Sequence, residues 1–126
     1  MQVRDDDACP TKTASVTPVS SADRIAALND TLRRHRTGGR LFLTPGIVQM
    51  GNGAVTLVLD AVATFTAFTA DNNPHGEHDF GAVEHDGIRL FWKIDYYDTD
   101  LRYGSPDPSN PAVTTRVLTI MLADEY

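Results

Sequence analysis

The densest group of side chains that could carry chemistry is the run His75-Gly76-Glu77-His78-Asp79. Divalent transition metals prefer imidazole and carboxylate ligands, so His75, His78 and Asp79 are candidate ligands of one metal ion. The same residues suit acid–base catalysis, because a histidine that titrates near neutral pH carries a proton while a carboxylate orients it. Two histidines in one loop also occur by chance and then shape the loop through hydrogen bonds. The run therefore supports one alternative hypothesis, a metal-dependent or acid–base enzyme.

The other residue sets that enzymes use do not occur in the sequence. It contains no nucleophile elbow and no glycine-rich loop that would hold phosphate groups. Its single cysteine, Cys9, cannot form an internal disulfide or a cysteine-based zinc site. Ser105 stands between Gly104 and Pro106, where turn formation explains it. We therefore expect no cofactor and favour a non-enzymatic role.

A second polar cluster combines tyrosines with carboxylates between residues 95 and 103. Exposed tyrosines ringed by charges are typical of binding surfaces, because the side chain offers a large contact area with few rotatable bonds. Tyr96 and Tyr97 must point to opposite faces of a strand, so core packing explains at least one of them equally well. The candidate residues for binding a partner are Asp95, Tyr96, Asp98, Asp100 and Tyr103.

Charge is distributed unevenly along the chain. The 126 residues include 17 acids and 11 lysines or arginines, which gives a net charge of −6. Residues 1–70 hold six acids and seven bases, whereas residues 71–126 hold eleven acids and four bases. An acidic second half would steer a basic protein and repel nucleic acid, although acids in loops also serve solubility alone. We expect a basic protein partner, such as a nucleic-acid-handling complex, and no direct contact with nucleic acid.

The elements that must position these residues belong to one domain, because 126 residues is near the commonest domain size. Residues 1–19 lack a hydrophobic period and are expected to form a disordered leader before a domain at 20–126. A helix is predicted over Ala22–His35, with a serine cap before it and Gly38-Gly39 after it. The basic residues of its last turn complement the helix dipole.

The middle of the chain is predicted to hold a strand, a helix and a loop. The strand covers Arg40–Thr44, with a buried Leu-Phe-Leu core, and ends at a turn formed by Pro45-Gly46. The segment Ala54–Phe68 fits both helical spacing and strand alternation, and its length favours a helix capped by Asn52. Residues 69–79 are then a polar loop.

The clearest local signal is a β-hairpin. Strands over Phe80–His85 and Ile88–Tyr97 flank Asp86-Gly87, the sequence of a type I′ turn. A two-residue turn places His85 opposite Ile88 and fixes every pair behind it, including Gly81 with Trp92. A last strand is predicted over Val113–Ala123, with a helix as the alternative because its apolar residues also satisfy helical spacing.

This order of elements predicts an α+β fold with about four mostly antiparallel strands and two helices packed on one face. No apolar run is long enough to span a membrane, and no signal peptide begins the sequence, so we expect a cytoplasmic protein. An exposed edge at Arg40–Thr44 would also allow a homodimer, because unpaired strand edges invite pairing.

Five sequence blocks carry a resemblance to a known family: RIAALNDTLR, TGGR, FTADNNPHGEHDFGAVEHDG, FWKIDYYD and TTRVLTIMLADEY. Through them the run Ala22–Tyr126 resembles the bacterial family catalogued as domain of unknown function 3768. The resemblance implies a helix at Ala54–Phe68 and no established activity. It also implies an origin in proteobacteria, often beside plasmid and other mobile-element genes. From that context we expect an inhibitor of a defence complex, of the anti-CRISPR or anti-restriction type.

Overall fold

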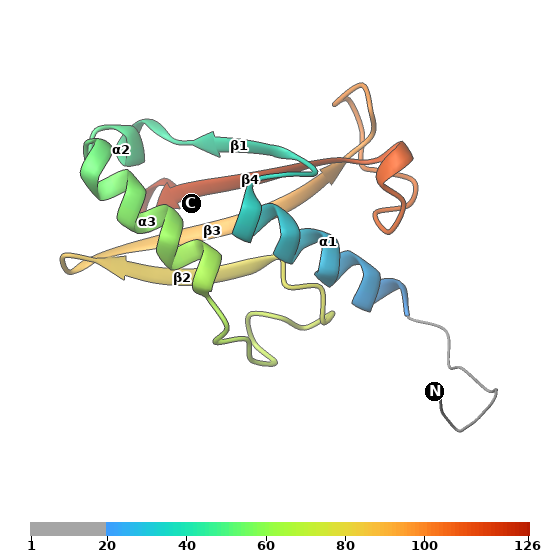
Figure 1. Ribbon diagram of the computed structural model, residues 1–126, viewed down its shortest axis with the longest axis horizontal. Helices are drawn as coiled ribbons and strands as arrows, with labels where there is room; N and C mark the ends of the chain where they lie inside the picture. Colours follow the sequence, from blue (N-terminus) through green and yellow to red (C-terminus); the bar gives the residue numbers. More distant parts are fainter. Residues whose placement is uncertain (1–19) are drawn as a thin grey trace, which may run out of the picture.

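The computed structural model describes residues 20–126, in which helices lie across one face of a four-stranded sheet (Figure 1). The predicted leader, residues 1–19, lies outside the described residues. The helices are α1 (Ser21–His35), α2 (Pro45–Val48) and α3 (Asn52–Thr64). The strands are β1 (Arg40–Leu43), β2 (Phe80–His85), β3 (Ile88–Tyr97) and β4 (Thr115–Leu122), and η1 (Pro111–Val113) and η2 (Ala123–Glu125) are single 3-10 turns. Among the described helices, none combines the length and apolar character that a membrane crossing requires.

The sheet has the strand order β1-β4-β3-β2. β4 pairs with β3, and β3 with β2, in antiparallel directions, whereas β1 joins β4 in parallel. The predicted α+β class with mostly antiparallel strands is therefore confirmed. The last segment is a strand, and its helical alternative is wrong. α2 is a third, short helix where a turn at Pro45-Gly46 was predicted.

The hairpin has the predicted register. His85 pairs with Ile88, and the other predicted pairs follow along both strands. Asp86 and Gly87 have φ angles of 49° and 77°, the left-handed values that both central residues of a type I′ turn require. The turn sequence therefore sets which side chains of β3 face the helices.

The core lies between the helices and one face of the sheet. Side chains of β3 and β4 alternate, so every second residue points toward the helices. The buried residues that pack together in this core are Leu32, Ile47, Val58, Val62, Leu90, Trp92, Ile94, Leu118 and Ile120. The opposite sheet face is not covered by any described helix (Figure 1).

Three local expectations about the middle of the chain are wrong at least in part. Two residues of the predicted Leu-Phe-Leu core of β1 are not buried, because β1 is an edge strand and Leu41 and Phe42 are 37% and 54% exposed, whereas Leu43 packs against the core. α3 is capped by Gly51 instead of Asn52, and it ends at Thr64, four residues earlier than predicted.

The guanidinium of Arg33 from α1 donates to the carbonyl oxygens of Val62 and Phe65, at 2.7 and 3.0 Å, and so occupies the end of α3.

Gly81 is needed for the packing of Trp92, and we expect Gly81→Ala to destabilise the fold. A Cβ atom there would lie 2.5 Å from Trp92 Nε1 and 2.8 Å from Phe65 Cζ. Overpacking of this kind costs about 1–3 kcal/mol. Urea unfolding followed by fluorescence measures the loss, since Trp92 is the single tryptophan of the chain. Gly53→Ala is the control, because a Cβ at Gly53 meets nothing within 4 Å; equal losses in both variants would contradict this account.

The carboxylate of Glu125 connects η2 to the start of α2 through hydrogen bonds. Its Oε1 accepts from the hydroxyl of Thr44 at 2.6 Å and from the N–H of Leu122 at 2.9 Å. Its Oε2 accepts from the N–H of Gly46 at 3.0 Å. These hydrogen bonds hold the pKa of the Glu125 carboxyl below its ordinary value of 4.5, and the bond from Thr44 has the largest effect.

The hydrogen bonds of Glu125 give a pH-dependent prediction. Because the folded-state pKa of Glu125 is depressed, its stabilising contribution is present above pH 4.5 and is lost as pH falls through the folded-state value. We expect Glu125→Gln to lower the melting temperature at pH 7, with a difference from wild type that narrows below pH 4.5. Thermal melts across this pH range test it, with Asp124→Asn of the same turn as control. A constant difference at all pH values would refute the linkage.

Candidate functional site

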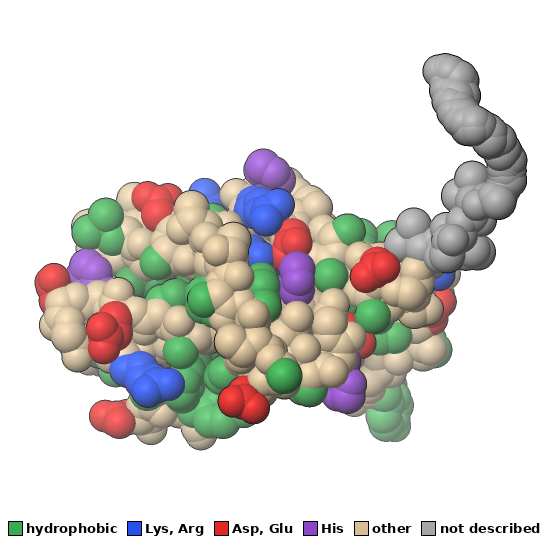
Figure 2. Space-filling model, turned by 90° about the horizontal axis from the view of Figure 1, so that it is seen from below, with side chains coloured by type: hydrophobic (Ala, Val, Ile, Leu, Met, Phe, Trp, Pro, Cys, Tyr) green, Lys and Arg blue, Asp and Glu red, His purple; other side chains and the backbone are tan. Residues whose placement is uncertain are grey.

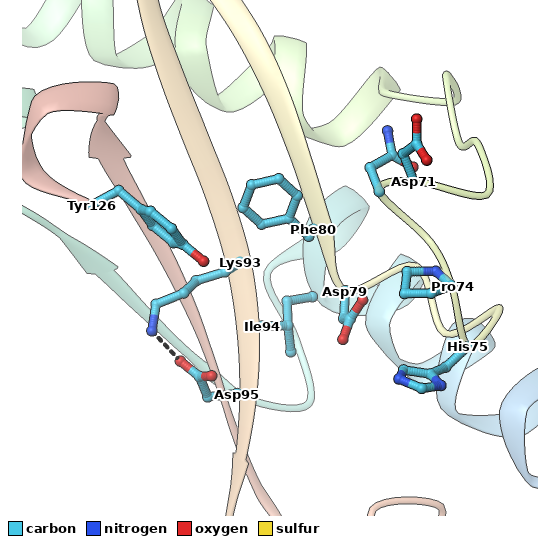
Figure 3. Close-up of a pocket in the computed structure, with 10 residues that line it drawn as sticks. Asp71, Pro74, His75, Asp79, Phe80, Lys93, Ile94, Asp95 and Tyr126 are labelled. Atoms are coloured by element: carbon cyan, nitrogen blue, oxygen red, sulfur yellow. Dashed lines mark ion pairs between the residues drawn. The ribbon is translucent and has the colours of Figure 1, made fainter.

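A hollow of about 400 Å³ lies between the loop at residues 65–79 and the sheet face that the helices leave open. Figure 3 shows Asp79 in its middle, with Asp71, Pro74 and His75 on the loop side and Lys93 and Asp95 on the strand side. Phe80 and Tyr126 supply aromatic surface. We call this site the acidic hollow; its acidic and basic residues are Asp71, His75, Asp79, Lys93 and Asp95.

Strand geometry places the floor of the acidic hollow. Lys93 and Asp95 are two residues apart in β3 and therefore share a face of the sheet. Their Nζ and Oδ2 atoms lie 2.8 Å apart in an ion pair, and both side chains are 37% exposed. The N–H of Ile94 donates to the carbonyl oxygen of Asp79 at 2.9 Å, which attaches the end of the loop to β3.

Side-chain hydrogen bonds shape the loop wall of the acidic hollow. The Asn72 side chain accepts from the N–H of Thr69 at 2.8 Å and donates to the carbonyl of Ala67 at 3.1 Å. The Asn73 side chain accepts from the N–H of His78 at 2.9 Å. Asparagine side chains thus add hydrogen bonds to the backbone of the loop and stabilise the wall.

Burial perturbs the carboxyl group at the centre of the acidic hollow. The pKa of Asp79 is raised above its ordinary value of 3.8, first by burial and then by the negative charge of Glu77. The nearby His75 acts in the opposite direction. On the strand side, the hydrogen bond to Asp95 raises the pKa of Lys93. The Lys93 ammonium therefore stays charged and paired with Asp95. The ionised form of Asp79 is therefore disfavoured, and within residues 20–126 no lysine or arginine forms an ion pair with it.

The raised pKa predicts that Asp79→Asn stabilises the protein. A carboxyl whose folded-state pKa is raised binds its proton more tightly when folded, so its ionisation lowers stability as pH rises above 3.8. We expect Asp79→Asn to have a higher melting temperature than wild type at pH 7 and an equal one at acidic pH. Thermal melts at both pH values measure this. An asparagine variant that is less stable at pH 7 would show that the carboxylate is instead a structural partner.

An aromatic group borders the acidic hollow on the open sheet face. Phe80 and Phe91 pair across β2 and β3, with ring centroids 5.3 Å apart. Tyr126 packs against both rings, at 6.0 Å from Phe80 and 5.4 Å from Phe91. The side chain of Tyr126 is nevertheless 74% exposed, so its ring offers a free surface beside the carboxylates.

His78 lies apart from the other two candidate metal ligands. Its Nδ1 is 3.1 Å from each carboxylate oxygen of Asp30 in α1, and its ring stacks on Phe68 at 4.0 Å with an interplanar angle of 5°. His75 and Asp79 line the acidic hollow instead. Within residues 20–126, no group of three or more histidine, cysteine, aspartate or glutamate side chains could hold a metal ion. The geometry therefore assigns His78 to the attachment of the loop to α1.

The structure also divides the five residues predicted to bind a partner. Asp95 lines the acidic hollow, whereas Tyr96 points to the other sheet face. Asp98 Oδ1 accepts from the N–H groups of Asp100 and Arg102, at 3.2 and 3.0 Å, and so closes the loop after β3. Tyr103 in that loop is 72% exposed, and Asp100 is exposed beside it.

Tyr96 belongs to a buried polar network beneath the helices. The Asn29 side chain, which is fully buried, donates to the Tyr96 hydroxyl at 2.8 Å and accepts from Arg116 Nε at 2.9 Å. The Tyr96 hydroxyl donates to Glu77 Oε1 at 3.0 Å. Burial is the main cause that raises the pKa of Tyr96. Tyr96 thus fastens the loop to the core, as the alternative of core packing predicted.

Acidic side chains do not gather into one patch on the face that Figure 2 shows. Seen from the side of β2 and the 65–79 loop, they are spread singly among apolar and neutral groups (Figure 2). Sequence reasoning found Asp79, His75 and Asp95 but missed Asp71, Lys93 and Tyr126. The spacing of Lys93 and Asp95, two residues apart in a predicted strand, indicates that they share a face of the sheet. The position of Tyr126 depends instead on the turn η2 after β4.

One comparison with known proteins gives a match. The model of a family described as "Protein of unknown function (DUF3768)" matches residues 43–125. This confirms the resemblance inferred from the sequence blocks, although the blocks before Leu43 lie outside the matched range. No curated protein and no solved structure matches the chain.

Proposed function

Because the chain belongs to the family of unknown function DUF3768, its function must be argued from the site, and we propose a non-enzymatic protein-binding module. In this proposal the acidic hollow takes up a lysine or arginine side chain of a basic protein partner. One observation carries the proposal: Asp71, Asp79 and Asp95 line a single hollow, and burial raises the pKa of the Asp79 carboxyl.

A bound cation would relieve the electrostatic cost at Asp79. Ionised Asp79 is disfavoured by burial and by Glu77, and Lys93 is already paired with Asp95. An incoming ammonium or guanidinium group would restore the favourable interaction that the carboxylate lost when it left water. The gain is larger than at a solvated surface carboxylate, because a partly buried pair is less screened.

The walls of the acidic hollow suit the rest of such a side chain. Lysine and arginine carry apolar stems that pack on apolar surface while the charged end reaches a carboxylate. A guanidinium also stacks on aromatic rings, and Phe80 and Tyr126 offer such rings beside Asp79 and Asp95. These features favour arginine over lysine as the inserted residue.

The charge of the chain supports a partner that normally handles nucleic acid. Such complexes present clustered lysines and arginines, and a chain with a net charge of −6 is steered toward them. Occupation of that basic surface would exclude nucleic acid, so the module would act as an inhibitor in the cytoplasm. An anti-CRISPR or anti-restriction role, encoded on mobile elements, is the form of this activity that we propose.

Capture of a partner by matched variants tests the proposal. Tagged wild type, the variant Asp71→Asn/Asp79→Asn/Asp95→Asn and the control Asp60→Asn/Asp86→Asn/Asp124→Asn are incubated with bacterial lysate at low and moderate salt. Both variants lose three negative charges. We expect wild type and control to retain a basic nucleic-acid-handling protein, more weakly at higher salt, and the first variant to lose it. Equal capture by all three proteins would refute a role of the acidic hollow.

The same geometry keeps acid–base catalysis as a second candidate function. A histidine and a carboxyl of raised pKa, His75 and Asp79, line one hollow, and perturbed carboxyls are common at catalytic sites. In this reading Asp79 donates the proton and His75 accepts it. Hydrolysis assays with ester and phosphoester substrates, on wild type and His75→Ala, separate the two functions. Turnover that His75→Ala abolishes would favour the enzyme over the binding module.

A further inference from the structure

β1 is the strand at one edge of the sheet, and no described element lies beyond it (Figure 1). It pairs on one side only, in parallel with β4, from Arg40 with Val117 to Leu43 with Ile120. Its middle residues, Leu41 and Phe42, are 37% and 54% exposed. An apolar edge strand of this kind is a template for a further strand.

The backbone of β1 has outward hydrogen-bonding groups at alternate residues. The N–H of Thr44 donates to the carbonyl of Ile120 in β4 at 3.2 Å. Because these groups alternate in direction along a strand, the backbone N–H and C=O groups of Phe42 also point toward β4. Leu41 and Leu43 therefore direct their N–H and C=O groups away from the sheet, toward any strand that is added.

We propose that the occupant of this edge is β1 of a second copy of the chain, in antiparallel orientation about a twofold axis. The register places Phe42 opposite Phe42 of the second copy and Leu41 opposite its Leu43. In that register the two leucine pairs exchange backbone hydrogen bonds, because their groups point outward. The phenylalanine pair then occupies the non-hydrogen-bonded position, where side chains approach most closely.

Charge complementarity favours a second copy as the occupant. The same register brings Arg40 opposite Thr44 of the second copy, whose hydroxyl donates to Glu125 at 2.6 Å. Arg40 therefore meets the carboxylate of Glu125 across the axis, and symmetry repeats this pairing at the other end.

Sedimentation equilibrium from about 10 µM to about 1 mM protein tests the dimer. A four-residue strand buries little area, so we expect a weak dimer with a dissociation constant on the order of 10–100 µM. Phe42→Lys should weaken it at least about tenfold, because it puts two ammonium groups face to face. Leu57→Lys is the control, since Leu57 is 58% exposed on α3, and should change the constant less than about twofold. Fluorescence of Trp92 confirms that each variant folds.

Disulfide trapping tests the register in a Cys9→Ser background. Phe42→Cys should cross-link to itself on oxidation, because the two Cβ atoms of a non-hydrogen-bonded pair approach about 5 Å. Leu41→Cys and Leu57→Cys should not. A protein that is monomeric throughout the concentration range, a dimer insensitive to Phe42→Lys, or self-cross-linking at position 41 instead of 42 would each overturn the proposal.

Discussion

Replacement of Arg33 by leucine is expected to lower the free energy of unfolding by about 2–4 kcal/mol. The Arg33 side chain is fully buried, and its guanidinium donates to Asp30 Oδ1 at 2.6 Å as well as to the carbonyls of Val62 and Phe65. It also lies 4.9 Å from the ring centre of Trp92. Leucine would leave two carbonyls at the end of α3 and one carboxylate without these donors.

Urea unfolding followed by Trp92 fluorescence measures this loss. The control is Arg34→Leu, because Arg34 is the next residue of α1 and is exposed. A change within about 0.5 kcal/mol is expected there. If Arg33→Leu were as stable as Arg34→Leu, the apolar packing of leucine would have replaced the whole network, and Arg33 would not be required to end α3.

Replacement of Asp79 by lysine is expected to reduce the affinity for a hexa-arginine peptide by about tenfold to a hundredfold. The substitution puts an ammonium group at the centre of the acidic hollow, where the proposed partner places its own cation. Lysine would also pair with the other carboxylates of the hollow and so compete with the peptide. Titration calorimetry at low salt measures the affinity, because added salt screens the interaction.

Asp60→Lys is the matched control for this experiment. It makes the same change in net charge on α3, at an exposed position away from the hollow. We expect its affinity to fall by less than about threefold, through the net charge alone. Equal losses in Asp79→Lys and Asp60→Lys would mean that the peptide responds to net charge and that the hollow recognises nothing.

Local signals in the sequence predicted the elements whose causes are local. Ser20 accepts from the N–H of Asp23 at 3.1 Å and begins α1 as expected. The dipeptide Asp86-Gly87 fixed the hairpin, because few residues tolerate two successive left-handed conformations. Alternation within β3 likewise predicted that Tyr96 and Tyr97 diverge.

Elements that depend on distant contacts could not be predicted in this way. α3 ends where Arg33, some thirty residues earlier, binds its last carbonyls. α2 begins where Glu125, from the other end of the chain, binds the N–H of Gly46. β1 pairs with β4, its most distant strand in the sequence, and this leaves Leu41 and Phe42 exposed at an edge. No local pattern encodes any of these contacts.

The candidate site shows the same division. His75 and Asp79 line the same hollow as Asp95 because the carbonyl of Asp79 is hydrogen-bonded to Ile94 of β3, a contact that follows from the hairpin. His78 turns away because its backbone is left-handed, with φ 57°, and because Asp30 of α1 holds its ring. Sequence proximity grouped His75 with His78, and the tertiary structure separated them.

The most direct test of the acidic hollow is chemical-shift mapping of the ¹⁵N-labelled protein during titration with hexa-arginine, with hexa-glutamate as control. We expect saturable shifts that cluster at the N–H groups of Asp71, His75, Asp79, Lys93 and Asp95, and we expect Asp79→Lys to suppress them. Hexa-glutamate should cause none. Shifts spread evenly over the exposed acids, including Asp60, Asp86 and Asp100, or the absence of saturable shifts, would contradict a specific cation site.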